Sequence, residues 1–206
     1  MSSRLFTRAL VPVAAAALLA LAGCGSDTGG ATGSASDDHN DADVTFAQDM
    51  IPHHQQALVM ADVAIEGAET QELQDLAERI KAAQAPEIEE MTGWLESWGE
   101  DVPDLDAMSH MMMGHGDGDE DNDMPGMMDA DQMQQMSSMM GDGLAFDRMW
   151  VLMMIEHHEG AIEMAQDQQA NGQSEDAIAL AESIEESQTA EIDEMKQMLG
   201  DWKNQG

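Results

Sequence analysis

The feature that most constrains the fold is an internal repeat, which becomes visible when the chain is aligned with itself at a constant offset of 104 residues. Residues 50–61 match residues 154–165 at seven of twelve positions, and both copies contain Met-Ile-x-His-His. A second block, residues 84–98 against residues 188–202, keeps the same register. Two separate blocks in one register indicate that each half of the chain is a copy of one ancestral unit.

Each unit is predicted to form two amphipathic helices, because apolar residues recur at alternating steps of three and four. Thr45 with Gln48 fits a capping box at the start of the first helix, and Gly67 fits a left-handed stop after it. Pro52 and Pro86 lie inside helical patterns, where each is expected to kink or restart the helix. The expected buried face of the first helix includes Phe46, Met50, His53, Ala57, Met60 and Ala64.

One helical hairpin cannot cover its own apolar faces, so two copies packed about a pseudo-twofold axis are the simplest way to close a core. The predicted fold is therefore all-α, a four-helix bundle made of two tandem helical hairpins, residues 43–100 and 144–206. A coiled-coil dimer or an open helical array is disfavoured, because the hairpin turns are short and the buried faces are wider than a coiled-coil seam.

The beginning of the chain is typical of a bacterial lipoprotein signal. Arg4 and Arg8 precede an apolar run that ends in Leu-Ala-Gly-Cys at Cys24, which resembles a lipobox. We expect a signal peptide at 1–23, lipidation at Cys24, and a flexible tether over residues 24–42. This predicts a cell-envelope protein, anchored through its lipid on the outer face of the cytoplasmic membrane or in the periplasm. A cleaved signal that leaves a free thiol, or an uncleaved anchor, would also place the domain outside the cytoplasm.

Charge and cysteine content narrow the possible partners. The chain has 42 acidic and 7 basic residues, for a formal net charge of −35, which argues against nucleic acid or an anionic membrane surface as partners. The electrostatic field of this negative charge concentrates cations, although a strongly acidic surface can also serve only to keep the protein soluble. Because Cys24 is the only cysteine, neither an intrachain disulfide nor a thiolate site elsewhere is available, and any soft sulfur ligand must come from one of the 21 methionines.

The two hairpins are joined by a connector, residues 101–143, which holds eleven of the methionines. Methionine and histidine clustered in an acidic exported segment can wrap a copper(I) ion, although methionine can also act as an adaptable apolar filler. Residues 129–140 are expected to form a short helix capped by Asp129 or Asp131. The candidate ligands in the connector are His110, Met111, Met112, Met113 and His115.

Polar residues on the expected buried faces are the strongest functional signal, because burying them without partners costs a few kcal/mol. Both copies place histidine, glutamate, glutamine and methionine there, so closing the bundle would gather them in one interior layer. The predicted bundle ligands are His53, His54, His157, His158, Glu87, Glu191, Met50, Met154, Met91 and Met195.

This mixture of donors suits soft metals. Thioethers favour copper(I) and silver(I), so copper(I) is the expected ion, silver(I) is the second choice, and iron or zinc is less favoured. The same residues could instead form a buried hydrogen-bond network that fixes the register of the bundle without metal.

The segments Asp43–Ala57 and Phe146–His158, with their doubled Met-Ile-x-His-His, resemble the DUF305 family over residues 43–203. This resemblance implies a ferritin-like four-helix bundle in an exported protein, in a family with members linked to copper and silver binding or resistance.

Two other functions remain open. A ferritin-like di-metal oxidase would need Glu three residues before a ligand His on one helix. Met50 and Met154 occupy those positions before His53 and His157, and isoleucine occupies them before His54 and His158, which argues against that chemistry. A purely structural helical surface lipoprotein would use the histidines as core residues.

Overall fold

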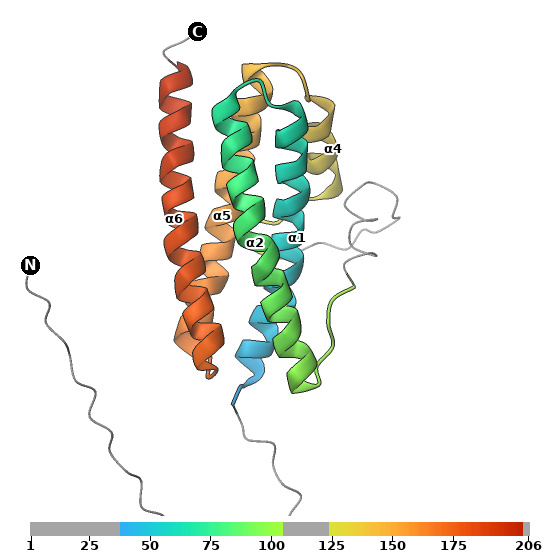
Figure 1. Ribbon diagram of the computed structural model, residues 1–206, viewed down its shortest axis with the longest axis vertical. Helices are drawn as coiled ribbons and strands as arrows, with labels where there is room; N and C mark the ends of the chain where they lie inside the picture. Colours follow the sequence, from blue (N-terminus) through green and yellow to red (C-terminus); the bar gives the residue numbers. More distant parts are fainter. Residues whose placement is uncertain (1–37, 105–123, 204–206) are drawn as a thin grey trace, which may run out of the picture. The chain divides into compact units, whose positions relative to one another are not determined.

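The computed structural model describes residues 38–104 and 124–203, and all the regular secondary structure in them is helical. Figure 1 shows the long helices side by side, with a short helix beside them. The predicted all-α bundle of two tandem hairpins is therefore confirmed in class. The helices are α1 (Asp41–Gly67), α2 (Gln71–Trp98), α4 (Ala130–Ser138), α5 (Leu144–Asn171) and α6 (Glu175–Lys203).

The ends of α1 differ from the sequence prediction. The helix starts before Thr45, because the Asn40 side chain accepts hydrogen bonds from the amides of Ala42 and Asp43, and the Asp43 carboxylate accepts a hydrogen bond from the Asn40 amide. This earlier capping box replaces the predicted one at Thr45. Gly67 is the last helical residue, and the chain leaves α1 through extended backbone at Ala68 instead of a left-handed glycine. The missing side chain of Gly67 instead leaves room for Met140.

The helices run unbroken through both internal prolines, so neither proline restarts a helix. A proline removes only one backbone hydrogen bond, and tertiary packing of the amphipathic face holds the turns on either side. Pro52 is itself buried among the α1 core residues.

The long helices pack as α1 on α2 and α5 on α6, and α1 packs against α5 to join the two hairpins. On the other side, Arg79 of α2 and Glu194 of α6 form an exposed ion pair, which contributes at most about 1 kcal/mol. Burial of the apolar faces therefore supplies most of the association between the hairpins.

The buried core consists of two apolar clusters, and each long helix contributes to both. Along α1, residues Phe46 to Ile51 belong to one cluster and residues Ala57 to Ala64 to the other. The interval between the two clusters is occupied on every long helix by buried or half-buried polar residues. The Trp150 indole lies in the larger cluster, where its Nε1 donates to the Met60 carbonyl at 2.8 Å.

Two aspartates that are equivalent in the repeat lock the hairpins to each other. Asp43 near the start of α1 accepts from the amides of Gln173 and Ser174 in the turn between α5 and α6, both at 3.1 Å. Asp147 near the start of α5 accepts from the amides of Glu69 and Thr70, at 2.9 and 3.0 Å, in the turn between α1 and α2. Each hairpin thus caps the turn of the other, which fixes their relative register.

The second half of the connector is ordered against the bundle. Asp129 caps α4 through a capping box with Gln132, as one of the two predicted alternatives required. Met133 and Met136 of α4 are buried in the larger apolar cluster, so these methionines are core residues.

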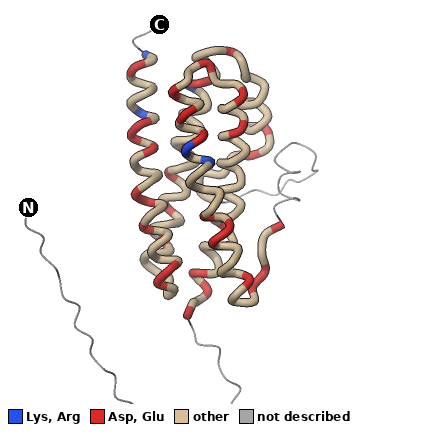
Figure 2. The backbone as a smooth tube through the Cα atoms, viewed as in Figure 1, with Lys and Arg blue, Asp and Glu red and all other residues tan. Residues whose placement is uncertain are grey.

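None of the helices in residues 38–104 and 124–203 is long and apolar enough to cross a membrane. Figure 2 shows acidic residues along the length of the long helices and basic residues at only a few places.

We expect Asp147→Asn to lower the free energy of unfolding by about 1 to 3 kcal/mol, because an amide cannot accept from all three donors of the α1–α2 turn. Asp43→Asn should have a similar effect at the other turn. Urea unfolding followed by circular dichroism measures both, with Glu182→Gln, the same chemical change on an exposed residue of α6, as the control. Equal stability of all three variants would contradict the capping role.

Candidate metal centre

One level of the bundle gathers polar side chains from all four long helices, between the two apolar clusters. The four histidines and two glutamines of this level are buried, and the two glutamates are half-buried. The polar layer is made of His53 and His54 on α1, Gln84 and Glu87 on α2, His157 and His158 on α5, and Gln188 and Glu191 on α6.

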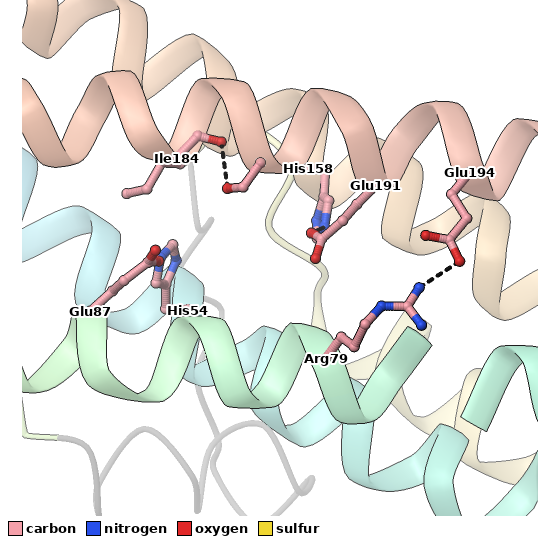
Figure 3. A network of polar contacts seen from close by, with 8 residues as sticks. His54, Arg79, Glu87, His158, Ile184, Glu191 and Glu194 are labelled. Atoms are coloured by element: carbon pink, nitrogen blue, oxygen red, sulfur yellow. Dashed lines mark hydrogen bonds and ion pairs between the residues drawn. The ribbon is translucent and has the colours of Figure 1, made fainter. Parts of the chain in front are cut away.

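The repeat produces two equivalent His-Glu pairs in this layer, and Figure 3 shows both. The His54 Nε2 atom lies 2.6 Å from a Glu87 carboxylate oxygen, and the His158 Nε2 atom lies 2.8 Å from one of Glu191. Both imidazoles are fully buried, whereas the glutamate side chains are 16% and 17% exposed. Each glutamate therefore contacts solvent at one side and fixes the orientation of a buried ring at the other.

The other two histidines form the centre of the layer, where α1 packs against α5. The rings of His53 and His157 lie with their centroids 3.8 Å apart and their planes tilted by 38°. The His53 Nε2 atom lies 3.1 Å from the Pro125 carbonyl oxygen, whereas neither ring nitrogen of His157 has a hydrogen-bond partner in the described parts of the chain.

The hydrogen-bond partners determine which ring nitrogen is free. The Pro125 carbonyl can only accept, so His53 Nε2 carries the proton and donates; carboxylates of Glu87 and Glu191 assign the same tautomer to His54 and His158. The Nδ1 atoms of these three rings are buried and have no partner within residues 38–104 and 124–203. A metal-binding histidine typically has this arrangement, with an oxygen acceptor on one nitrogen and a free lone pair on the other.

The four bundle methionines predicted as ligands lie in the core beside the layer. Met50 and Met91 are fully buried in the smaller apolar cluster, and Met154 and Met195 are fully buried in the larger one. Thioethers therefore flank the polar layer on both sides. Among the described residues, no three His, Cys, Asp or Glu side chains are close enough together to hold one metal ion. The candidate ligands of the layer are therefore not gathered around a single point in this structure.

A segment of the connector that we call the strap, Pro125–Met128, packs against the layer and was not predicted from the sequence. Gln56 holds it through two hydrogen bonds to the Met128 backbone, both 2.8 Å long. Gly160, which stands at the position equivalent to Gln56 in the second copy, leaves the space that the strap occupies against α5. The signal that could have shown this is the replacement of Gln by Gly within an otherwise similar motif.

The remaining predicted site residues lie outside the described residues. These are the lipidation site Cys24 and the connector residues His110, Met111, Met112, Met113 and His115.

Comparison with known proteins identifies the family. The sequence model of the Domain of unknown function DUF305 matches residues 43–199. The chain belongs to the DUF305 family. A search of curated proteins gave no match.

Several solved DUF305-type structures resemble this one. A DUF305 protein from Streptomyces coelicolor, assigned as secreted, is 30% identical, with a TM-score of 0.66 over 81% of this chain and 95% of that one. CopM in its Cu(I)-bound form is 33% identical, with a TM-score of 0.61 over 78% of this chain and 96% of that one. CopM bound to Cu(II) is 35% identical over 78% of this chain and 97% of that one, also with a TM-score of 0.61. CopM has also been solved bound to silver.

Burial shifts the acid–base behaviour of the central histidines of this DUF305 chain. Desolvation, with a smaller contribution from the nearby His54, lowers the pKa of His53 to about 3. Desolvation, followed by the neighbouring His53 and His158, also lowers the pKa of His157 well below its usual value. Both rings are therefore neutral at physiological pH, the form in which imidazole binds metals.

We expect the stability of the metal-free protein to fall as the pH drops below about 6.5, where an unfolded histidine gains its proton. Because the folded state keeps both central rings neutral, the unfolded state binds more protons at low pH. Each ring should therefore lower the free energy of unfolding by about 1.4 kcal/mol at pH 5.5. Urea unfolding at pH 7.5 and 5.5 measures the difference. The variant His53→Gln/His157→Gln should lose this part of the pH dependence, and an unchanged dependence would contradict the burial of neutral rings.

Proposed function

We propose that this DUF305 protein is an exported, lipid-anchored binding protein for copper(I), with silver(I) as a second ion, and that the polar layer is its principal binding site. The ion is cargo that the protein sequesters or handles. The proposed ligands are the free nitrogens of the four buried histidines, together with thioether sulfur from the methionines that flank them.

One observation carries this proposal: three buried imidazoles in the two copies have an oxygen acceptor on Nε2 and an unpartnered lone pair on Nδ1. Leaving several buried acceptors without partners costs about 1 to 3 kcal/mol each. Protonation does not remove this cost at His53, because burial lowers its pKa. A bound cation satisfies these lone pairs, which explains why the layer is kept in the core.

The donor set also indicates the kind of metal. Hard ions prefer carboxylates and carbonyls, whereas imidazole combined with thioether favours copper(I) and silver(I). Met50 and Met154 stand one turn before His53 and His157, and both are fully buried. We propose Glu87 and Glu191 as partners that orient the histidines, in place of the direct ligand role expected from the sequence.

The similar structures support this choice. CopM, at 33% and 35% identity, has been solved with Cu(I) and with Cu(II), and it has also been solved with silver. The relative from Streptomyces coelicolor is assigned as secreted, which fits the proposed signal peptide at 1–23 and lipid anchor at Cys24. On this proposal the domain faces the outside of the cytoplasmic membrane or the periplasm.

The connector is proposed as a second, weaker copper(I) site. Its candidate ligands are the cluster His110 to His115. Met133 and Met136 lie on α4, outside this cluster, and pack in the larger apolar cluster. A Met111→Leu/Met112→Leu/Met113→Leu variant keeps the length and apolar character of the segment and removes its sulfur. It should lose the weaker binding event and keep the tight one.

We expect the purified protein without residues 1–23 to bind copper(I) tightly in competition with a chromophoric chelator under anaerobic conditions. His53→Ala/His157→Ala and His54→Ala/His158→Ala should each weaken the tight event by at least about tenfold, because each removes two of the proposed nitrogen donors. His39→Ala is the matched control, since His39 stacks on Trp98 away from the layer.

The same titration separates the other functions. Tight iron binding with oxygen consumption, and weak copper(I) binding, would favour the di-metal oxidase. Binding of no ion would leave a structural lipoprotein, in which the layer only sets the register. Equal copper(I) affinity of the two double histidine variants and the His39→Ala control would reject the polar layer as the site.

A further inference from the structure

The two central histidines occupy equivalent positions in the repeat but have different surroundings. His53 has the Pro125 carbonyl at 3.1 Å from its Nε2, whereas neither nitrogen of His157 has such a partner in the described part of the chain, where the His53 backbone acts on that ring only weakly. The strap is responsible for this difference, because a single segment cannot serve both positions of a twofold arrangement.

Contacts to both hairpins fix the strap. On α1, the buried Gln56 amide donates to the Met128 carbonyl and accepts from the Met128 amide, which satisfies both backbone groups of that residue. On α5, a Cβ atom on Gly160 would lie 2.1 Å from the Pro125 carbonyl oxygen and 2.6 Å from the Gly126 nitrogen. Only glycine at position 160 therefore allows the strap to lie where it does.

The strap itself also requires glycine at its centre. Gly126 has a φ of 74°, and a Cβ atom there would lie 2.7 Å from the Glu156 carbonyl and 2.9 Å from the His157 carbonyl. Such a conformation strains any other residue. The Pro125 carbonyl is thus held within hydrogen-bond distance of His53 by three residues, Gln56, Gly126 and Gly160.

We infer that Gln56, Gly126 and Gly160 are positioning residues for metal binding, which act by holding the Pro125 carbonyl against His53. This carbonyl keeps the proton of His53 on Nε2 and its Nδ1 lone pair available, so His53 is a preorganised donor and His157 is an adaptable one. The inference rests on the proposed function, since it assigns these residues a role at the same site. It also makes a claim about the metal-free protein, which can be tested separately.

The test is long-range ¹H–¹⁵N NMR of histidine side chains in the metal-free protein at neutral pH, with assignments from the His53→Gln and His157→Gln variants. In the unmodified protein, His53 should show a single Nε2–H tautomer, and His157 should show a mixture. Gln56→Ala should convert His53 to a mixture. Gln84→Ala is the matched control, because it removes a buried glutamine of the same layer whose amide forms no hydrogen bond to the strap.

Gly160→Ala gives the same comparison by a different physical change, since it pushes the strap away without removing a hydrogen-bonding side chain. It serves if Gln56→Ala does not fold. Both variants should also increase the rate of copper(I) release to a chelator by about 10- to 100-fold. A single His53 tautomer that persists in every folded strap variant would overturn the inference. If the unmodified protein binds no copper(I), the proposed function fails, and the tautomers still decide whether the strap positions His53.

Discussion

Four buried imidazole rings cross the core of this bundle at one level, and they divide its apolar interior into two clusters. A polar layer in this position is costly, because each buried group without a partner lowers stability by about 1 to 3 kcal/mol. The clusters on either side, with large buried residues such as Trp150 and Trp202, offset this cost through apolar burial. The rest of the structure supports the layer: the aspartate-capped turns fix the register of the hairpins, and the glutamates orient two of the rings.

The repeat in the sequence accounts for the residues of the layer and for the one position where its two halves differ. A single hairpin supplies two histidines and one glutamate, and the second copy brings an equivalent set across the pseudo-twofold axis. The symmetry is broken at one place, where Gln56 faces the strap from α1 and Gly160 makes room for it on α5. Divergence of a single repeat position has thus given two equivalent histidines different hydrogen bonding, which a strictly symmetric site could not do.

Much of this architecture was predicted from sequence patterns with a known physical cause. The offset of 104 residues and the helical spacing of apolar residues predicted two packed hairpins, and the buried polar positions predicted which side chains meet. The ends of α1 were less predictable, because Asn40 and Thr45 both fit a cap and local pattern does not choose between them. The restart expected as one alternative at the prolines does not occur, because tertiary packing holds a helix through a single lost backbone bond. The strap was not predicted, since it depends on a close approach of backbone to Gly160 that leaves no periodic signal; the only sequence clue is the replacement of Gln by Gly at this position of the repeat.

The central claim is that imidazole nitrogens of the polar layer bind soft metal ions. X-ray absorption spectroscopy of the protein loaded with one equivalent of copper(I) tests it most directly, because it identifies the atoms bound to the metal. The account predicts nitrogen scattering from imidazole rings together with sulfur, and a weaker imidazole signal in the His53→Ala/His157→Ala variant, which keeps only His54 and His158 of the four buried histidines. A spectrum with sulfur ligands alone, identical in that variant, would place the copper on methionines outside the layer and contradict the account.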